Sequence, residues 1–179
     1  MFSVVFKYKL FSYCCMWTLF FISYVLLCFV LPLYVFPFMR NTISFTRLPQ
    51  QLEDFAQRCA VEHTRPIDYI HAVLSYVLSQ HKPSRRESVF SFFFAFETNI
   101  KKIFSRRGHI HTNHLLLLCY VLLAKAPFLR SEDMKISYSV VNLHIHPYIR
   151  VRIAGQWYPV DPLAVSRGKA VGSVLFGFS

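Results

Sequence analysis

Acidic side chains are scarce in this chain. Its 179 residues include 9 Asp and Glu against 20 Lys and Arg, which gives a formal net charge of +11. Such an imbalance suits an anionic partner, either lipid headgroups or nucleic acid. The basic residues are scattered rather than gathered into a stripe, and no nucleic-acid-binding motif accompanies them. We therefore interpret them as solvated surface charge and expect no nucleic-acid partner.

The chain also lacks a Cys-x-x-Cys pair, which excludes the common structural zinc patterns. Three of the five cysteines, Cys14, Cys15 and Cys28, fall in the first forty residues and leave only Cys59 and Cys119 for the remainder. Two cysteines establish no disulfide framework. We expect no cofactor from these residues, and no internal repeat or low-complexity tract suggests a repeat architecture.

Charge is absent from Leu10 to Met39, a run of 30 residues rich in Phe, Leu, Val and Tyr. Roughly 20 apolar residues span a bilayer. The run exceeds the apolar region of a signal peptide, and no small-x-small cleavage site follows it. We predict an uncleaved single-pass membrane anchor over residues 1–40, with residues 10–39 in the lipid bilayer. Basic residues flank the run almost equally, so its orientation only leans towards an extracytoplasmic domain.

Beyond the anchor we expect a linker over residues 41–48, one domain over 49–165 and a tail over 166–179. Apolar spacing of three and four residues predicts one helix from about Pro49 and a second from Pro66. The core-facing stripe of the first helix consists of Leu52, Phe55, Ala56, Cys59 and Ala60.

The middle of the domain is predominantly apolar. Residues 88–104 carry six phenylalanines, which we interpret as packing side chains. A following helix from Leu115 to about Lys125 is apolar nearly all round and should be buried at the centre of the domain. Alternating apolar residues from Ile136 to Ile145 then predict a strand.

The segment from His146 to Asp161 carries the clearest functional signal. It reads as a strand, a tight turn at Ala154-Gly155 and a second strand. In such a hairpin the start of the first strand lies beside the end of the second, so His146 and Asp161 should come within side-chain reach. An imidazole held by a carboxylate is the base and orienting group of a nucleophilic triad.

This segment resembles the transglutaminase-like, papain-related cysteine protease superfamily. A family strand that opens His-Ala-Trp-Val matches His146-Pro147-Tyr148-Ile149, and a second strand, Trp-(Val/Tyr)-Pro-Val-Asp-Pro, matches Trp157 to Pro162. The resemblance covers roughly Pro49 to Pro162. It implies an α+β fold, with helices packed on a small antiparallel sheet after the transmembrane helix, and it implies that His146 and Asp161 are the catalytic pair.

The family cysteine opens the buried central helix, where backbone N–H groups and the helix dipole stabilise a thiolate. Different alignments place it within Ile110, His111, Thr112 and Asn113, and none of these is cysteine. Cys119 falls inside the helix, where we expect a buried, inert thiol. Thr112 or Asn113 is better explained as the helix N-cap. Acyl transfer through a thioester is therefore not expected.

The leading functional prediction is a membrane-anchored transglutaminase-like protein that is catalytically degenerate and binds a protein or peptide in its cleft. The alternative is an active amidase, peptidase or acyl transferase with a substitute nucleophile or a metal-bound water. His111, His114 and His146 would be the metal ligands in that alternative. A third interpretation is a membrane-associated structural protein whose hairpin resembles the family by accident.

Overall fold

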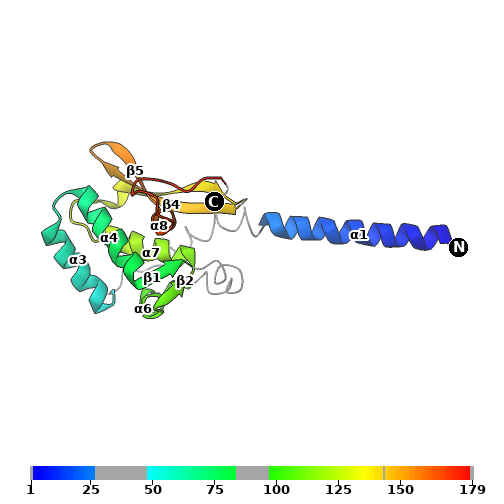
Figure 1. The fold of residues 1–179 in the computed structure, drawn as a ribbon, viewed down its shortest axis with the longest axis horizontal. Coiled ribbons are helices and arrows are strands. Elements are labelled where there is room, and N and C mark those ends of the chain that lie inside the picture. Colours follow the sequence, from blue (N-terminus) through cyan, green and yellow to red (C-terminus); the bar gives the residue numbers. More distant parts are fainter. Residues whose placement is uncertain (1, 27–47, 84–96, 143, 178–179) are drawn as a thin grey trace.

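The computed structural model describes residues 2–26, 48–83, 97–142 and 144–177 (Figure 1). Helices and two small sheets alternate along this mixed α/β chain. The helices are α1 (Phe2–Val25), α3 (Gln50–Glu62), α4 (Pro66–Gln80), α6 (Ile100–Ser105), α7 (Thr112–Leu123) and α8 (Pro162–Ser166), with a 3₁₀ turn at Ser131–Asp133. The strands are β1 (His81–Pro83), β2 (Gly108–Ile110), β3 (Met134–Val141), β4 (His144–Ile153) and β5 (Gln156–Val160).

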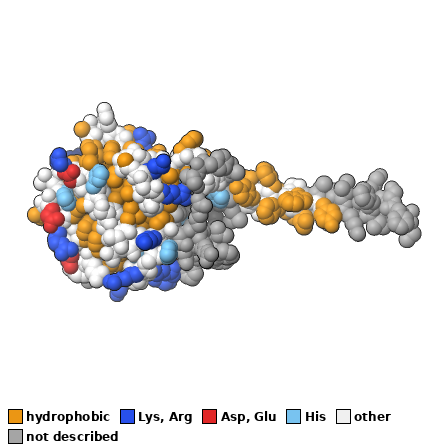
Figure 2. All heavy atoms as spheres, viewed as in Figure 1, with side chains coloured by type: hydrophobic (Ala, Val, Ile, Leu, Met, Phe, Trp, Pro, Cys, Tyr) orange, Lys and Arg blue, Asp and Glu red, His pale blue; other side chains and the backbone are white. Residues whose placement is uncertain are grey.

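The N-terminal helix differs from the predicted membrane anchor. Helix α1 begins at Phe2 and ends at Val25, so it includes Lys7 and Lys9, while residues 27–39 of the predicted span lie outside the described residues. None of the helices in the described ranges combines the length and apolarity that a membrane crossing requires. The predicted fold class, with its transmembrane helix, was wrong in this respect, and so was the single-pass membrane localisation with its extracytoplasmic lean. Helix α1 projects away from the other elements, and apolar side chains cover its described surface (Figures 1 and 2).

Helices α3 and α4 confirm the apolar spacing seen in the sequence. Leu52, Ala56 and Cys59 form the buried side of α3. Pro66 occupies the first turn of α4, where its missing N–H group leaves no hydrogen bond unmade. The buried Tyr69 hydroxyl donates a hydrogen bond of 2.9 Å to the Leu122 carbonyl and thereby ties α4 to the central helix α7.

Helix α7 is the centre of the domain, as its composition predicts. Every residue from His114 to Leu123 is buried, and α7 contacts α4, α6, β4 and α8. The predicted boundaries differ by a few residues, because the helix begins at Thr112 and its last hydrogen-bonded turn passes into Ala124.

The main sheet is antiparallel, in the order β3-β4-β5. The predicted turn is confirmed: Ala154 and Gly155 have φ values of 48° and 82°, the conformation of a two-residue hairpin turn. Ile149 pairs with Val160, and both are completely buried against the helical core. Pro159 lies on edge strand β5 at a position where no ladder N–H group is needed.

A second sheet joins distant parts of the chain. Strands β1 and β2 run parallel, with His81 opposite Gly108 and Pro83 opposite Ile110. This pairing places the chain directly before α7 against the end of α4. Of the six phenylalanines predicted to pack over residues 88–104, only Phe104 lies within the described residues, and it packs against the core from α6.

Candidate functional site

His146 and Asp161 lie together as the hairpin predicts. His146 is the third residue of β4, and Asp161 directly follows β5 on the neighbouring strand. The His146 Nε2 atom lies 3.0 Å from both Asp161 carboxylate oxygens. Only 9% of His146 and 1% of Asp161 is exposed. The pair is therefore a buried, directly hydrogen-bonded imidazole and carboxylate.

Asp161 also holds the chain that follows it. Its Oδ1 atom accepts hydrogen bonds from the backbone N–H groups of Leu163, at 3.0 Å, and Ala164, at 3.1 Å, and so caps helix α8. Its Oδ2 atom accepts from the Leu175 N–H group at 3.1 Å. These bonds and the one from His146 satisfy the buried charge, and they fix the carboxylate at one position.

This arrangement decides which nitrogen of His146 carries the proton. A carboxylate only accepts, so Nε2 must donate and Nδ1 of the neutral ring then carries the lone pair. No residue in the described part of the chain forms a hydrogen bond with Nδ1. His146 thus has the orientation of a general base, with Asp161 holding its tautomer.

The start of α7 differs from the sequence-based prediction. His111, rather than Thr112 or Asn113, is the N-cap, and its Nδ1 atom accepts a 3.1 Å hydrogen bond from the Asn113 N–H group. Burial, and secondarily the neighbouring His114, lower the pKa of His111 to about 4. The ring is consequently neutral near pH 7, and its Nδ1 lone pair is occupied by the cap.

No thiol stands at the expected nucleophile position. Ile110 is a core residue of β2 with 2% exposure, His111 is the cap, and Thr112 and Asn113 are the first two residues of α7. Cys119 lies seven residues into the helix, roughly 10 Å along its axis from Thr112. It is fully buried, and burial followed by the negative charge of Asp161 raises the pKa of its thiol far above the ordinary value. This thiol is protonated and has no access to a substrate.

The histidines do not assemble into a metal centre. Among the described residues, which include His111, His114 and His146, no three His, Cys, Asp or Glu side chains are arranged to hold a metal ion. The rings of His111 and His114 lie 5.8 Å apart. His144 is exposed, and its Nδ1 atom bonds to the Asn142 carbonyl oxygen at 2.6 Å.

Sequence reasoning missed His81. This residue is 1% exposed, its Nδ1 atom lies 3.1 Å from the Arg106 carbonyl oxygen, and its Nε2 atom has no hydrogen-bond partner among the described residues. Burial lowers the pKa of His81, so the ring stays neutral and donates from Nδ1. No periodic pattern in the sequence predicts the burial of His81, because it becomes buried only when β1 pairs with β2.

Comparisons of the chain with models of protein families, with curated proteins and with solved structures find no match. No family is therefore assigned. The geometry of the His146–Asp161 pair and the chemistry at the start of α7 are the observations that bear on function.

Proposed function

We propose that this chain is a transglutaminase-like domain without its nucleophile, and that it acts as a non-catalytic peptide-binding module. The buried His146–Asp161 pair, joined at 3.0 Å, carries the proposal. It supplies the base and the orienting carboxylate of the family's site, while the four residues around the start of α7 supply no thiol.

The positions of the two cysteine sulfur atoms in the domain support the proposed loss of catalysis. Acyl transfer requires an attacking thiolate at the site of the base. Cys119 is enclosed within α7, and Cys59 is buried in α3 with the pKa of its thiol raised to about 11 by burial and by Glu62. Neither sulfur can take part in that reaction in the folded chain.

The peptide preference rests on edge strand β3. The C-terminal segment already pairs with β3 there in a short parallel bridge. The Gly177 N–H group donates to the Val140 carbonyl oxygen at 2.9 Å, and the Asn142 N–H group donates to the Gly177 carbonyl oxygen at 2.9 Å. Strand alternation gives Ile136 and Tyr138 the same outward orientation of backbone groups as Val140. An extended peptide would add to this edge by main-chain hydrogen bonds.

The catalytic half of the proposal is tested by restoring the thiol. We would compare the native chain with Thr112→Cys and with Thr112→Cys/His146→Ala, using iodoacetamide labelling and p-nitrophenyl acetate hydrolysis. The native chain should show no hydrolysis that depends on His146. Thr112→Cys should gain a thiol that reacts at least about tenfold faster than an ordinary exposed thiol near pH 7, because a helix N-terminus favours the thiolate and the proposed arrangement requires His146 to lie beside it.

Ile110→Cys provides the matched control, because that position is two residues away and buried in β2. Iodoacetamide should label its thiol slowly, and the rate should be the same with and without His146→Ala. Hydrolysis by the native chain that disappears in His146→Ala would instead identify an active enzyme. A Thr112→Cys thiol indifferent to His146 would reject the transglutaminase-like arrangement.

The binding half is tested at the β3 edge. A displayed library of linear nonapeptides would be selected on the full chain, and the selected peptides would be measured with Ile136→Pro and Ile136→Val variants. Proline removes one outward N–H group without removing a bond to β4, whereas valine keeps that group. Affinity should fall at least about tenfold with proline alone. Equal affinities for both variants would place the peptides elsewhere.

A further inference from the structure

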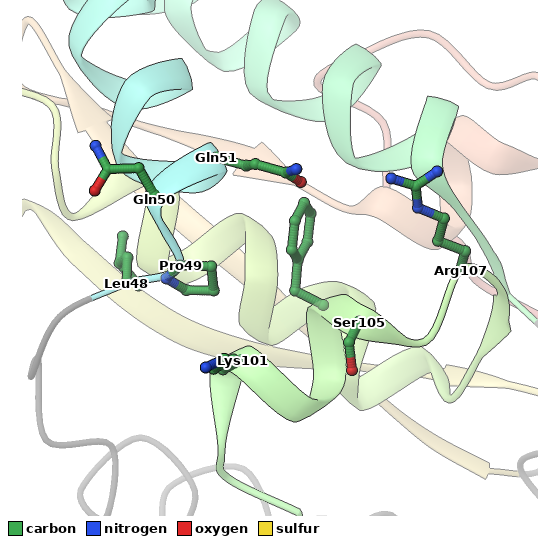
Figure 3. Close-up of a pocket in the computed structure, with 8 residues that line it drawn as sticks. Leu48, Pro49, Gln50, Gln51, Lys101, Ser105 and Arg107 are labelled. Atoms are coloured by element: carbon green, nitrogen blue, oxygen red, sulfur yellow. The ribbon is translucent and has the colours of Figure 1, made fainter.

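An open groove lies apart from the His146–Asp161 pair. It has a volume of about 690 Å³ and lies between the start of α3 and the segment from α6 to the loop before β2 (Figure 3). Cavities of roughly 300–1,000 Å³ are typical of small-molecule sites. Leu48 and Phe104 give the groove apolar walls, and polar side chains surround them.

The charged residues known to line this groove have one sign. Lys101 and Arg107 line it, and no acidic residue of the described ranges does. Neither side chain forms an ion pair with a described residue. Lys102, the next residue of α6, differs: its Nζ atom lies 2.6 Å from Glu97 and it does not line the groove. Within the described residues, the groove lining thus carries two cations and no carboxylate.

The remaining groups can orient a ligand. The Gln51 side chain forms no hydrogen bond within the described ranges, whereas its neighbour Gln50 is bonded to Asp54 at 2.7 Å. Gln51 and Arg107 extend towards each other from opposite sides of the groove (Figure 3). The Phe104 ring makes an edge contact with the buried His81 ring, with ring centroids 5.6 Å apart at 66°.

We propose that this groove binds a small organic anion consisting of a flat ring and an oxyanion. The ring would lie on Phe104, the oxyanion would bind Arg107 and the Gln51 amide, which extend towards each other, and Lys101 would add positive charge to the groove. Arginine donates two parallel N–H groups to a phosphate or similar oxyanion, and charge-assisted bonds of this kind are the strong ones. The site uses none of the residues of the proposed peptide module.

The probe is 1-naphthyl phosphate, and its binding to the full chain is followed by fluorescence anisotropy. Arg107→Gln should weaken binding at least tenfold, because it removes the bidentate donor. The matched control is Lys102→Gln, which removes the same charge from an exposed position nearby and should change affinity less than twofold. Circular dichroism confirms that each variant is folded.

Competitors identify the ligand chemistry. Inorganic phosphate should compete weakly, and Phe104→Leu should weaken the naphthyl compound while leaving the phosphate competition unchanged. A preference for 1-naphthyl phosphate over 1-naphthalenesulfonate identifies a phosphate site, and equal binding identifies a general oxyanion site. Binding of neutral 1-naphthol as tightly as the phosphate overturns the proposal. Equal weakening by Arg107→Gln and Lys102→Gln, or no binding of the phosphate at all, overturns it as well.

Discussion

Two imidazoles occupy the two halves of the proposed site, and their lone pairs are used differently. His146 donates from Nε2 to Asp161, and its Nδ1 atom is left without a described partner. His111 uses its Nδ1 lone pair to accept the Asn113 N–H group at the start of α7. The first ring keeps the atom that general-base chemistry requires, whereas the second has that atom occupied by the backbone.

The His146–Asp161 pair has a structural role of its own. Asp161 caps α8 and binds the Leu175 N–H group as well as His146, so its loss would disturb three parts of the chain. At the nucleophile position a cap is sufficient for stability, because the first N–H groups of α7 need only an acceptor. The stability of the fold therefore depends on the His146–Asp161 pair, whereas it does not require a thiol at the start of α7.

Removing Asp161 should have the largest effect on stability. Asp161→Ala deletes a helix cap and leaves the buried His146 Nε2–H and Leu175 N–H groups unpaired, which together should cost about 3 kcal/mol of unfolding free energy. His146→Ala should cost about half as much, because the Asp161 carboxylate keeps its backbone donors. Urea denaturation of both variants measures the two costs. Equal costs would show that the bond between the side chains, and not the caps, dominates.

The His111 cap makes stability depend on pH. Its pKa is about 4 in the folded chain against about 6.5 when unfolded, so the unfolded state binds more protons below pH 6.5. Stability should be fully present above pH 6.5 and should fall by about 2.5 kcal/mol as the pH decreases to 4.5. The lowered pKa of the buried His81 contributes with the same sign. Urea denaturation between pH 7.5 and 4.5 gives the slope.

His111→Asn isolates the cap from the other titrating groups. An asparagine oxygen accepts the same backbone N–H group and does not titrate in this range. The variant should keep nearly all of its stability at pH 7 and lose much of the slope. A slope identical to that of the native chain would assign the pH dependence to His81 or to other groups.

The hairpin and its histidine–aspartate contact could be predicted because their determinants are local. The Ala154-Gly155 turn sets the register, and register alone brings His146 beside Asp161. The burial of α7 was equally visible in its composition. The transmembrane helix was predicted wrongly, because an uncharged run in the sequence does not set the bounds of a helix, and α1 begins early enough to include Lys7 and Lys9.

Other features depend on contacts between distant residues. The His111 cap arises because β2 ends at Ile110 and turns the chain into α7, and the burial of His81 requires its pairing with Gly108. The Leu175 N–H group reaches Asp161 only after the tail folds back on the sheet. No local pattern in the sequence encodes these contacts.

The smallest expected effect concerns Gly172, in the C-terminal tail that supplies the Leu175 N–H group to Asp161. This residue has a φ of +91°, and a Cβ atom added to it would lie 2.6 Å from the Tyr158 hydroxyl oxygen. Gly168 has a φ of +77°, but nothing lies within 4 Å of its Cβ position. Gly168→Ala should therefore cost only the backbone term of about 1 kcal/mol, whereas Gly172→Ala adds the clash.

Combining Gly172→Ala with Tyr158→Leu should recover the part of the cost that comes from the clash and leave the backbone part, a coupling that a double-mutant cycle measures. The same displacement should loosen the Leu175 N–H group from Asp161 and speed its hydrogen exchange. Faster exchange in Gly172→Ala than in Gly168→Ala would show that packing of the tail on Tyr158 maintains the carboxylate beneath it. Equal exchange rates in the two variants would mean that Asp161 holds the Leu175 N–H group without help from this contact. The position of the Asp161 carboxylate beside His146 would then depend on β4, β5 and α8 alone.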